Sequence, residues 1–266
     1  MSASLEITKS NGVATVTLNR QEKHNAFDDA VIDELTSVFE DIDSDDSIRV
    51  MILAANGKNF SAGADLAWMK RMATYSYEEN LRDARALAKM LKTLNELSKP
   101  TIARLQGAAF GGAVGLVSCC DIAIATPTAS FALSEVKIGL IPATISPYVV
   151  RAIGERAARR YFVTAERFDA AQAHHLGLVS EIRAEIEIDG FISGLANTIK
   201  NNSPSAVSAA KKLALDIGNT QINDKLIEDT CERIADIRAS ENGQEGLTAF
   251  LEKRAPAWIN DVTEKK

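Results

Sequence analysis

Histidine and cysteine are scarce in this sequence, with three of each among 266 residues. The histidines, His24, His174 and His175, show neither an i, i+4 pair nor a His-Glu-x-x-His motif, which are typical of zinc sites on helices. Three cysteines are too few for a disulfide scaffold. Cys119 and Cys120 are adjacent in an apolar stretch, where we expect reduced thiols. The sequence therefore predicts no metal site and no disulfide framework.

The sequence also lacks a basic excess and a long apolar run. Lys and Arg number 30 against 36 Asp and Glu, which gives a net charge of −6, whereas proteins that bind duplex DNA usually carry excess positive charge. No stretch approaches the roughly 18 consecutive apolar residues of a membrane-spanning helix. Residues 1–6 do not resemble the start of a signal peptide. We expect a cytoplasmic protein that binds neither nucleic acid nor membrane.

Predicted strands alternate with predicted helices in the first half of the chain. Apolar and polar residues alternate on both sides of Asn11-Gly12, which predicts a hairpin over residues 5–18. The continuous apolar run 50–55 predicts a strand that is buried on both faces. Further strands are expected at 101–105, 121–125 and 129–132, and helices after the cap residue Asp28 or Asp29 and over 77–97. This order predicts an α/β core.

Helical periodicity dominates from about residue 145 onward. The expected helices lie near residues 147–153, 157–164, 170–176, 186–201, 204–217, 222–240 and 244–254. No low-complexity linker or internal repeat interrupts the chain. A helical tail that has no sheet of its own often packs against a neighbouring subunit, so we expect an oligomer.

Two loops rich in small residues join predicted strands to predicted helices. They are Phe60-Ser61-Ala62-Gly63-Ala64-Asp65-Leu66 and the glycine-rich stretch 107–115. The second matches neither a P-loop nor the G-x-G-x-x-G dinucleotide motif. The first turn of a helix presents free N–H groups, which can stabilise an anion or a developing oxyanion. The alternative is that the glycines only permit close packing of a helix on a strand. Two such loops in one core predict two backbone donors that converge on one ligand oxygen.

Glu135 is the best candidate for an acid or base. It follows the apolar run 131–133 and precedes Ile138-Gly139-Leu140-Ile141-Pro142, so apolar neighbours would raise its pKa toward a useful range. The alternative is a helix-capping or solvated glutamate. No Gly-x-Ser-x-Gly elbow is present, so the sequence does not predict a serine hydrolase.

These stretches together resemble the crotonase (enoyl-CoA hydratase/isomerase) superfamily over essentially the whole chain. Each motif is weak alone, but the complete set in order is highly specific. The motifs are Leu18-Asn19-Arg20, residues 23–26 (Lys-His-Asn-Ala), the two small-residue loops, Cys120-Asp121-Ile122, the stretch 134–142 around Glu135, and residues 245–254 near the C-terminus.

The resemblance implies an α/β fold of repeated ββα units that spiral into a core, followed by an all-helical C-terminal trimerisation region. We place the core at residues 1–200 and the helical oligomerisation region at 201–266. The implied substrate is an acyl-CoA thioester. Coenzyme A is part of that substrate, so no separate cofactor is expected. The implied assembly is a homotrimer or a dimer of trimers.

The resemblance also assigns roles to individual positions. The backbone N–H groups of Ala64 and Gly112 correspond to the oxyanion hole, and Glu135 corresponds to the second of two glutamates in typical hydratases. The substrate- and CoA-binding positions would be Lys23, Ala26, Ala62, Asp65, Leu66 and Gly111 in one subunit, and Phe250 and Lys253 from a neighbouring subunit.

Gly115 departs from this pattern, because it stands where typical hydratases carry their first glutamate. A single carboxylate can move one proton between two carbons, as in enoyl-CoA isomerases. Hydration with one glutamate requires that residue to serve both proton steps. The amino-acid sequence of residues 65–69, 113–121 and 142–147 resembles that of bacterial methylglutaconyl-CoA and isohexenylglutaconyl-CoA hydratases. We therefore favour a hydratase over an isomerase, and a catalytically idle acyl-CoA-binding scaffold is a third hypothesis.

Two expectations about charge follow from this reading. A glutaconyl thioester carries a second carboxylate, for which Lys70, Arg71 and Lys137 are candidate partners, although each can equally be a solvated surface residue. Coenzyme A is itself a polyanion, whereas the chain carries a net charge of −6. We expect a local cluster of Arg20, Lys23 and a neighbouring subunit's Lys253 to offset this unfavourable overall charge.

Overall fold

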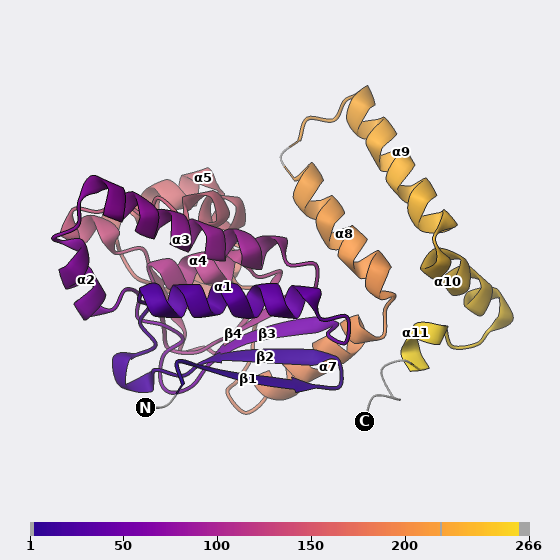
Figure 1. The fold of residues 1–266 in the computed structure, drawn as a ribbon, viewed down its shortest axis with the longest axis horizontal. Coiled ribbons are helices and arrows are strands. Elements are labelled where there is room, and N and C mark those ends of the chain that lie inside the picture. The colour runs from indigo at the N-terminus through magenta and orange to yellow at the C-terminus, as the bar shows by residue number, and fades with distance from the viewer. Residues whose placement is uncertain (1–2, 219, 261–266) are drawn as a thin grey trace.

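The centre of the computed structural model, which describes residues 3–218 and 220–260, is a six-stranded sheet with strand order β1-β2-β3-β4-β6-β9 (Figure 1). β1 and β2 form the predicted antiparallel hairpin, and the other neighbouring strands in this sheet are parallel. The strands are β1 (Leu5–Ser10), β2 (Val13–Leu18), β3 (Val50–Ala55), β4 (Thr101–Leu105), β6 (Ile122–Ala125) and β9 (Glu181–Ile182).

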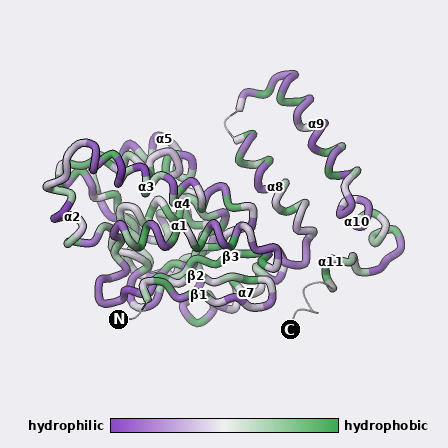
Figure 2. The backbone as a smooth tube through the Cα atoms, viewed as in Figure 1, coloured by the Kyte–Doolittle hydropathy of each residue, from purple (hydrophilic) through white to green (hydrophobic). Residues whose placement is uncertain are grey.

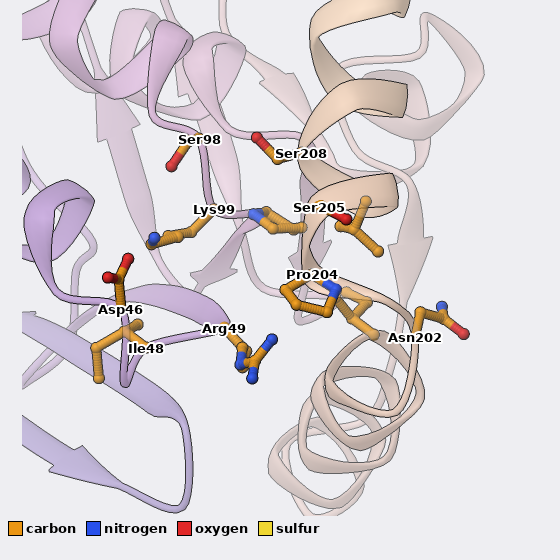
Figure 3. Close-up of a pocket in the computed structure, with 12 residues that line it drawn as sticks. Asp46, Ile48, Arg49, Ser98, Lys99, Asn202, Pro204, Ser205 and Ser208 are labelled. Carbon is orange, nitrogen blue, oxygen red and sulfur yellow. The ribbon is translucent and has the colours of Figure 1, made fainter. Parts of the chain in front are cut away.

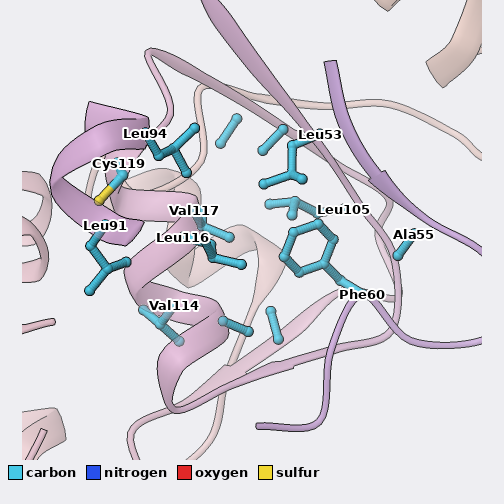
Figure 4. Packing of buried hydrophobic residues seen from close by; sticks show 14 of the residues in the cluster. Leu53, Ala55, Phe60, Leu91, Leu94, Leu105, Val114, Leu116, Val117 and Cys119 are labelled. Atoms are coloured by element: carbon cyan, nitrogen blue, oxygen red, sulfur yellow. The ribbon is translucent and has the colours of Figure 1, made fainter. Parts of the chain in front are cut away.

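Helices cover both faces of this sheet. On one face, α1 (Asp29–Ser44) and α3 (Tyr77–Glu96) contribute to a large apolar core, in which Leu116 and Val117 lie between Leu91 and Phe60 (Figure 4). On the other face, α7 (Ile188–Lys200) packs on Val50 and its neighbours. The prediction that β3 is buried on both faces is confirmed, because its alternate side chains point into different cores.

A second, three-stranded sheet of β5 (Ala108–Phe110), β7 (Ser130–Ala132) and β8 (Phe168–Asp169) leads into α4 (Gly112–Cys119). The helical periodicity after residue 145 did not predict β8 and β9, which lie there. Each has only two residues, too few to show an alternating pattern. β5 lies inside the glycine-rich stretch, where its short length likewise hides it from sequence patterns.

Short helices connect these layers. Asp28 caps α1 through the Val31 N–H at 3.0 Å, which selects the first of the two predicted cap residues. The helix α5 (Ser146–Thr164) spans the two helices expected near residues 147–153 and 157–164. Gly154 interrupts it with a non-helical φ of 77°. The remaining elements of the core are η1 (Gln21–Lys23), α2 (Leu66–Met72), η2 (Glu135–Ile138), α5 (Ser146–Thr164) and α6 (Ala170–His175).

The C-terminal helices extend away from the core (Figure 1). They are α8 (Pro204–Ile217), α9 (Asp224–Ala239), α10 (Glu241–Glu252) and α11 (Ala257–Asn260). Neither α8 nor α9 contains a buried residue among those described, and hydrophobic positions recur along these helices (Figure 2). Lys211 on α8 donates to Asp121 Oδ2 at 2.8 Å, which ties the helix to the end of the core sheet. The proposed domain boundary after residue 200 coincides with the end of α7 and stays a prediction, because part of residues 201–266 lies outside the described residues.

A cavity of about 380 Å³ separates the start of α8 from the core (Figure 3). Arg49 and Lys99 line it on the core side, and Ser205 and Ser208 line it on α8. The residues that resemble the family's active site do not line this cavity. Within the described residues, no helix combines the length and hydropathy needed to cross a bilayer.

Candidate active site

The two small-residue loops lie side by side. The Ser61 N–H donates to the Ala108 carbonyl at 2.9 Å, and the Phe110 N–H donates to the Ser61 carbonyl at 3.0 Å. Gly63, with a φ of +99°, lies so close to this strand that an added Cβ would stand 3.4 Å from the Phe110 carbonyl oxygen. The first loop is therefore attached to the small sheet immediately before α4 begins.

Phe27 holds the other side of the first loop. Its N–H donates to the Gly63 carbonyl at 2.8 Å, and its carbonyl accepts the Asp65 N–H at 2.7 Å. Successive peptide groups of an extended chain point to opposite sides, so the N–H of the intervening Ala64 faces away from Phe27. No hydrogen bond among the described residues uses that N–H, so it is available to a ligand.

Gly112 supplies the second available donor. It is the first residue of α4, where an N–H has no acceptor within the helix, and the hydrogen bonds of the described residues give it none elsewhere. Gly111 precedes it with φ 56° and ψ −122°, a conformation that suits glycine. The Phe27 ring lies 3.5 Å from where a Cβ on Gly112 would be. Phe27 thus contacts both donor segments.

Glu135 lies beside the Gly111–Gly112 segment, which carries the second donor. Its Oε1 is 3.2 Å from the position of a Cβ added at Gly111, so a side chain there would crowd the carboxylate. Its Oε2 is buried and has no hydrogen-bond partner among the described residues. Burial raises the pKa of the Glu135 carboxyl above its ordinary value. These features are typical of a group that exchanges a proton with a bound molecule.

Gly115 is tightly packed in the same region. A Cβ added there would lie 2.4 Å from Cγ2 and 2.9 Å from Cβ of Ile145, and 3.4 Å from Cδ2 of Leu91. Ile145 is only 2% exposed and lies between η2 and α5. The position that holds the first glutamate in typical hydratases is thus bordered by apolar side chains.

The expected positive cluster is already paired within the chain. Arg20 contacts Asp28 at 2.8 Å and Asp65 at 3.2 Å, and Lys23 contacts Asp65 at 2.9 Å. Asp65 also caps α2 by accepting the Ala67 N–H at 2.8 Å. Hydrogen bonding to Lys23 lowers the pKa of the Asp65 carboxyl. Two cations here face two carboxylates, so one subunit by itself supplies no positive excess at this place. The expected cluster with a neighbouring subunit's Lys253 stays a prediction.

The other predicted binding positions divide into two groups. Ala62 and Leu66 are exposed and Ala26 is buried, and all three lie on the segments that meet around Ala64. Phe250 is 81% exposed and Lys253 ends α10, which stands apart from α2 and α4 in Figure 1. One subunit does not bring this C-terminal pair to the other candidate residues, and their predicted reach into a neighbouring subunit stays a prediction.

Sequence reasoning did not identify Phe27 or Ile145. Phe27 lies in a loop before the α1 cap and acts through its backbone and ring, for which no sequence motif exists. Ile145 is 30 residues from Gly115 in the sequence, and only the return of the chain after η2 brings the two together. Among the candidates for a second substrate carboxylate, Arg71 is paired with Asp29 at 2.5 Å.

Comparisons with known proteins agree with this geometry. The sequence pattern of the family described as enoyl-CoA hydratase/isomerase matches residues 8–261. An enoyl-CoA hydratase from Shewanella pealeana has a similar crystal structure, with a TM-score of 0.94 and 49% identity over 96% of both chains. The short-chain-enoyl-CoA hydratase of Clostridium acetobutylicum is 32% identical over 93% of this chain and 94% of its own. The 2,3-dehydroadipyl-CoA hydratase of Escherichia coli is 30% identical over 95% and 97%.

The buried carboxylate predicts a pH-dependent stability difference. We expect Glu135→Gln to unfold at a higher temperature than wild type at about pH 7.5, because it removes a charge that the folded site desolvates. The folded protein keeps the Glu135 proton to higher pH than the unfolded chain, so ionisation lowers stability as pH rises between the two pKa values. At a pH below 4.5, the ordinary pKa of glutamate, the difference in unfolding temperature between the two proteins should vanish. Thermal unfolding by circular dichroism across this range measures it, with exposed Glu22→Gln as control. A difference that is independent of pH would contradict the desolvation argument.

The contact between Gly115 and Ile145 predicts strong coupling between substitutions. Gly115→Ala should cost about 1–3 kcal/mol through overpacking, and Ile145→Ala should cost about 2–5 kcal/mol through lost burial. In the double variant the new methyl group occupies space that Ile145 has left, so the combined cost should fall below the sum of the single costs. Urea denaturation of wild type, the two single variants and the double variant, all at the same protein concentration, gives their free energies of unfolding and hence the coupling energy. Additive costs would show that the two side chains do not compete for space.

Proposed function

The chain belongs to the enoyl-CoA hydratase/isomerase family, and from that premise we propose that it is a hydratase that adds water across the 2,3 double bond of a 2-enoyl-CoA. The observation that carries this proposal is the Glu135 carboxylate, which has one buried oxygen without a hydrogen-bond partner in the described part of the chain and lies against Gly111. The hydratase names of the similar proteins support the same reaction.

In the proposed mechanism, Ala64 and Gly112 donate hydrogen bonds to the thioester oxygen. Electron density moves onto this oxygen when a nucleophile attacks C3, because the double bond is conjugated with the carbonyl. Preorganised N–H donors stabilise that enolate more than they stabilise the neutral thioester, which lowers the barrier. Main-chain donors are sufficient for this task, so the residues themselves can be small.

Glu135 would serve both proton steps. Its carboxylate accepts a proton from water as the water oxygen bonds to C3. The resulting carboxylic acid then gives a proton to C2 as the enolate collapses to the thioester. Water is added in total, and Glu135 returns to its ionised form. A raised pKa suits this role, because the group must both accept and release a proton near neutral pH.

One observation favours a second candidate, a 3-enoyl-CoA to 2-enoyl-CoA isomerase. Ile145 and Leu91 border Gly115, the position where typical hydratases carry their first glutamate. An isomerase needs only one carboxylate, which takes a proton from C2 and returns it to C4. The two reactions differ in whether solvent oxygen enters the product.

A branched glutaconyl-CoA, such as 3-methylglutaconyl-CoA, is the finer substrate that we propose. It rests on the resemblance of residues 65–69, 113–121 and 142–147 to hydratases of such thioesters. The name of the E. coli relative likewise denotes a thioester with a second carboxylate. Lys137 is the candidate partner for that carboxylate, because it lies in the same short helix as Glu135 and forms no ion pair with the described residues.

We also propose that α8 to α10 pack against neighbouring copies to form a homotrimer or a dimer of trimers. Large apolar side chains on α9 and α10 are exposed in one chain, and their burial would supply the driving force. These residues are Ile227, Ile234, Leu247, Phe250 and Leu251. In that assembly Phe250 and Lys253 would approach the CoA of the next subunit.

Replacement of the catalytic carboxylate tests the reaction. Glu135→Gln keeps the shape of the side chain but cannot take a proton from water, so kcat for 2-enoyl-CoA hydration should fall about 10²–10⁴-fold with a small change in KM. Loss of absorbance of the conjugated thioester measures the rate. A variant that retains wild-type turnover would overturn the role of Glu135.

Labelled water separates the three hypotheses. A hydratase incorporates ¹⁸O from labelled water into the product, whereas an isomerase converts 3-enoyl-CoA without incorporating it. An idle binding scaffold shows acyl-CoA binding and no turnover of either thioester.

Substrate selectivity provides a test of Lys137. Lys137→Ala should raise KM for 3-methylglutaconyl-CoA about 10-fold, because it removes a charge-assisted hydrogen bond, and should leave KM for crotonyl-CoA within about twofold. Lys92→Ala, which replaces an exposed lysine of α3, is the matched control. Equal KM changes for both thioesters would contradict recognition of the second carboxylate by Lys137.

A further inference from the structure

Arg20 connects two segments that flank the Ala64 donor. Its Nη1 lies 2.8 Å from Asp28 Oδ2 and 3.1 Å from the Ala26 carbonyl oxygen, and its Nη2 lies 3.2 Å from Asp65 Oδ2. The first two acceptors stand on either side of Phe27 in the sequence, and the third is the residue after Ala64. The guanidinium therefore connects the segment around Phe27 to the segment around Ala64. A planar group with several N–H donors can make these three contacts at once.

Asp65 is shared by two cations of different mobility. Lys23 and Arg20 both contact Oδ2, but the Lys23 side chain is 45% exposed, whereas Arg20 is 13% exposed and Asp65 is 6% exposed. Lys23 can exchange its partner for one in solution at small cost, because its ammonium is already hydrated. Arg20 cannot do so without giving up its contacts with three buried or half-buried acceptors at once.

A phosphate of bound substrate would compete for Lys23. When Lys23 turns to that phosphate, Asp65 loses one of its two cations, and a buried carboxylate with no cation is unfavourable. The loss matters for the reaction because Asp65 begins α2 and its N–H anchors the loop to Phe27. Displacement of Asp65 would turn the Ala64 N–H away from the substrate oxygen.

We propose that Arg20 is a positioning residue that holds Asp65, and through it the Ala64 donor, when an acyl-CoA draws Lys23 away. This inference rests on the proposed function, since it needs an acyl-CoA that Lys23 contacts. Replacement of Arg20 would lower kcat mainly for substrates that carry phosphates. A residue that merely stabilises the fold would affect turnover of every substrate equally.

Substrates with and without phosphates provide the test. Crotonyl-CoA carries the CoA phosphates, whereas crotonyl-pantetheine has the same thioester and none of them. Arg20→Gln should lower kcat about 10–100-fold for crotonyl-CoA, as expected for a displaced oxyanion donor, and only about twofold for crotonyl-pantetheine. Arg20→Lys keeps the charge but cannot span three acceptors, so it should give a smaller difference of the same sign.

Arg104→Gln is the matched control. Arg104 is a half-buried arginine that bonds Glu185 and Asp189 between β4 and α7, away from the donors. Its replacement should change kcat for the two substrates by the same factor. If Arg20→Gln does not fold, the comparison of Arg20→Lys with wild type carries the test.

The outcomes are separable. Equal losses of kcat for crotonyl-CoA and crotonyl-pantetheine in the Arg20 variants would overturn the positioning role while leaving the proposed function intact. Absence of turnover by wild type with either thioester would instead overturn the proposed function itself.

Discussion

The pairing of Phe27 with the segment around Ala64 is the constraint on which the rest of the site depends. Two short hydrogen bonds, to the Gly63 carbonyl and from the Asp65 N–H, satisfy the peptide groups on either side of Ala64. Since successive peptide groups of an extended chain point in opposite directions, the intervening Ala64 N–H must face away from Phe27. A donor whose direction is set by backbone pairing needs no reorganisation when charge develops on a ligand.

The burial of Glu135 lowers local stability at the position where we propose the catalytic acid and base. A carboxylate oxygen that is buried without a partner is unfavourable for folding. Ile145 and Leu91 lie close to Gly115, and glycine itself has no acid group. In the proposed reaction Glu135 would therefore serve both proton steps.

Charge in this protein is organised locally. The chain has a net charge of −6, yet its candidate substrate is a polyanion. Arg20, Lys23, Asp28 and Asp65 form a compact, balanced cluster in place of the expected positive patch. Only the more exposed of the two cations can be released to a substrate at small cost. A neighbouring subunit that brought Lys253 to this cluster would add positive charge there. The exposed C-terminal helices would then contribute to binding of the polyanionic substrate.

Much of the fold followed from local patterns. Turn residues, apolar periodicity and cap residues predicted the hairpin, the doubly buried strand β3 and the bounds of α8, because each depends on residues close together in the sequence. The strands β5, β8 and β9 escaped prediction because two or three residues show no period. Their formation depends on pairing with distant partners.

The candidate site divides in the same way. The sequence by itself determined which residues could act: a glutamate among apolar neighbours, two glycine-containing loops at helix starts, and a glycine where a second acid would stand. Only the tertiary structure decided that the two loops lie side by side, that Phe27 contacts both, that Ile145 packs against Gly115, and that Arg20 and Lys23 share Asp65. These relations join segments tens of residues apart, and their geometry comes from sheet pairing and core packing, which no local pattern encodes.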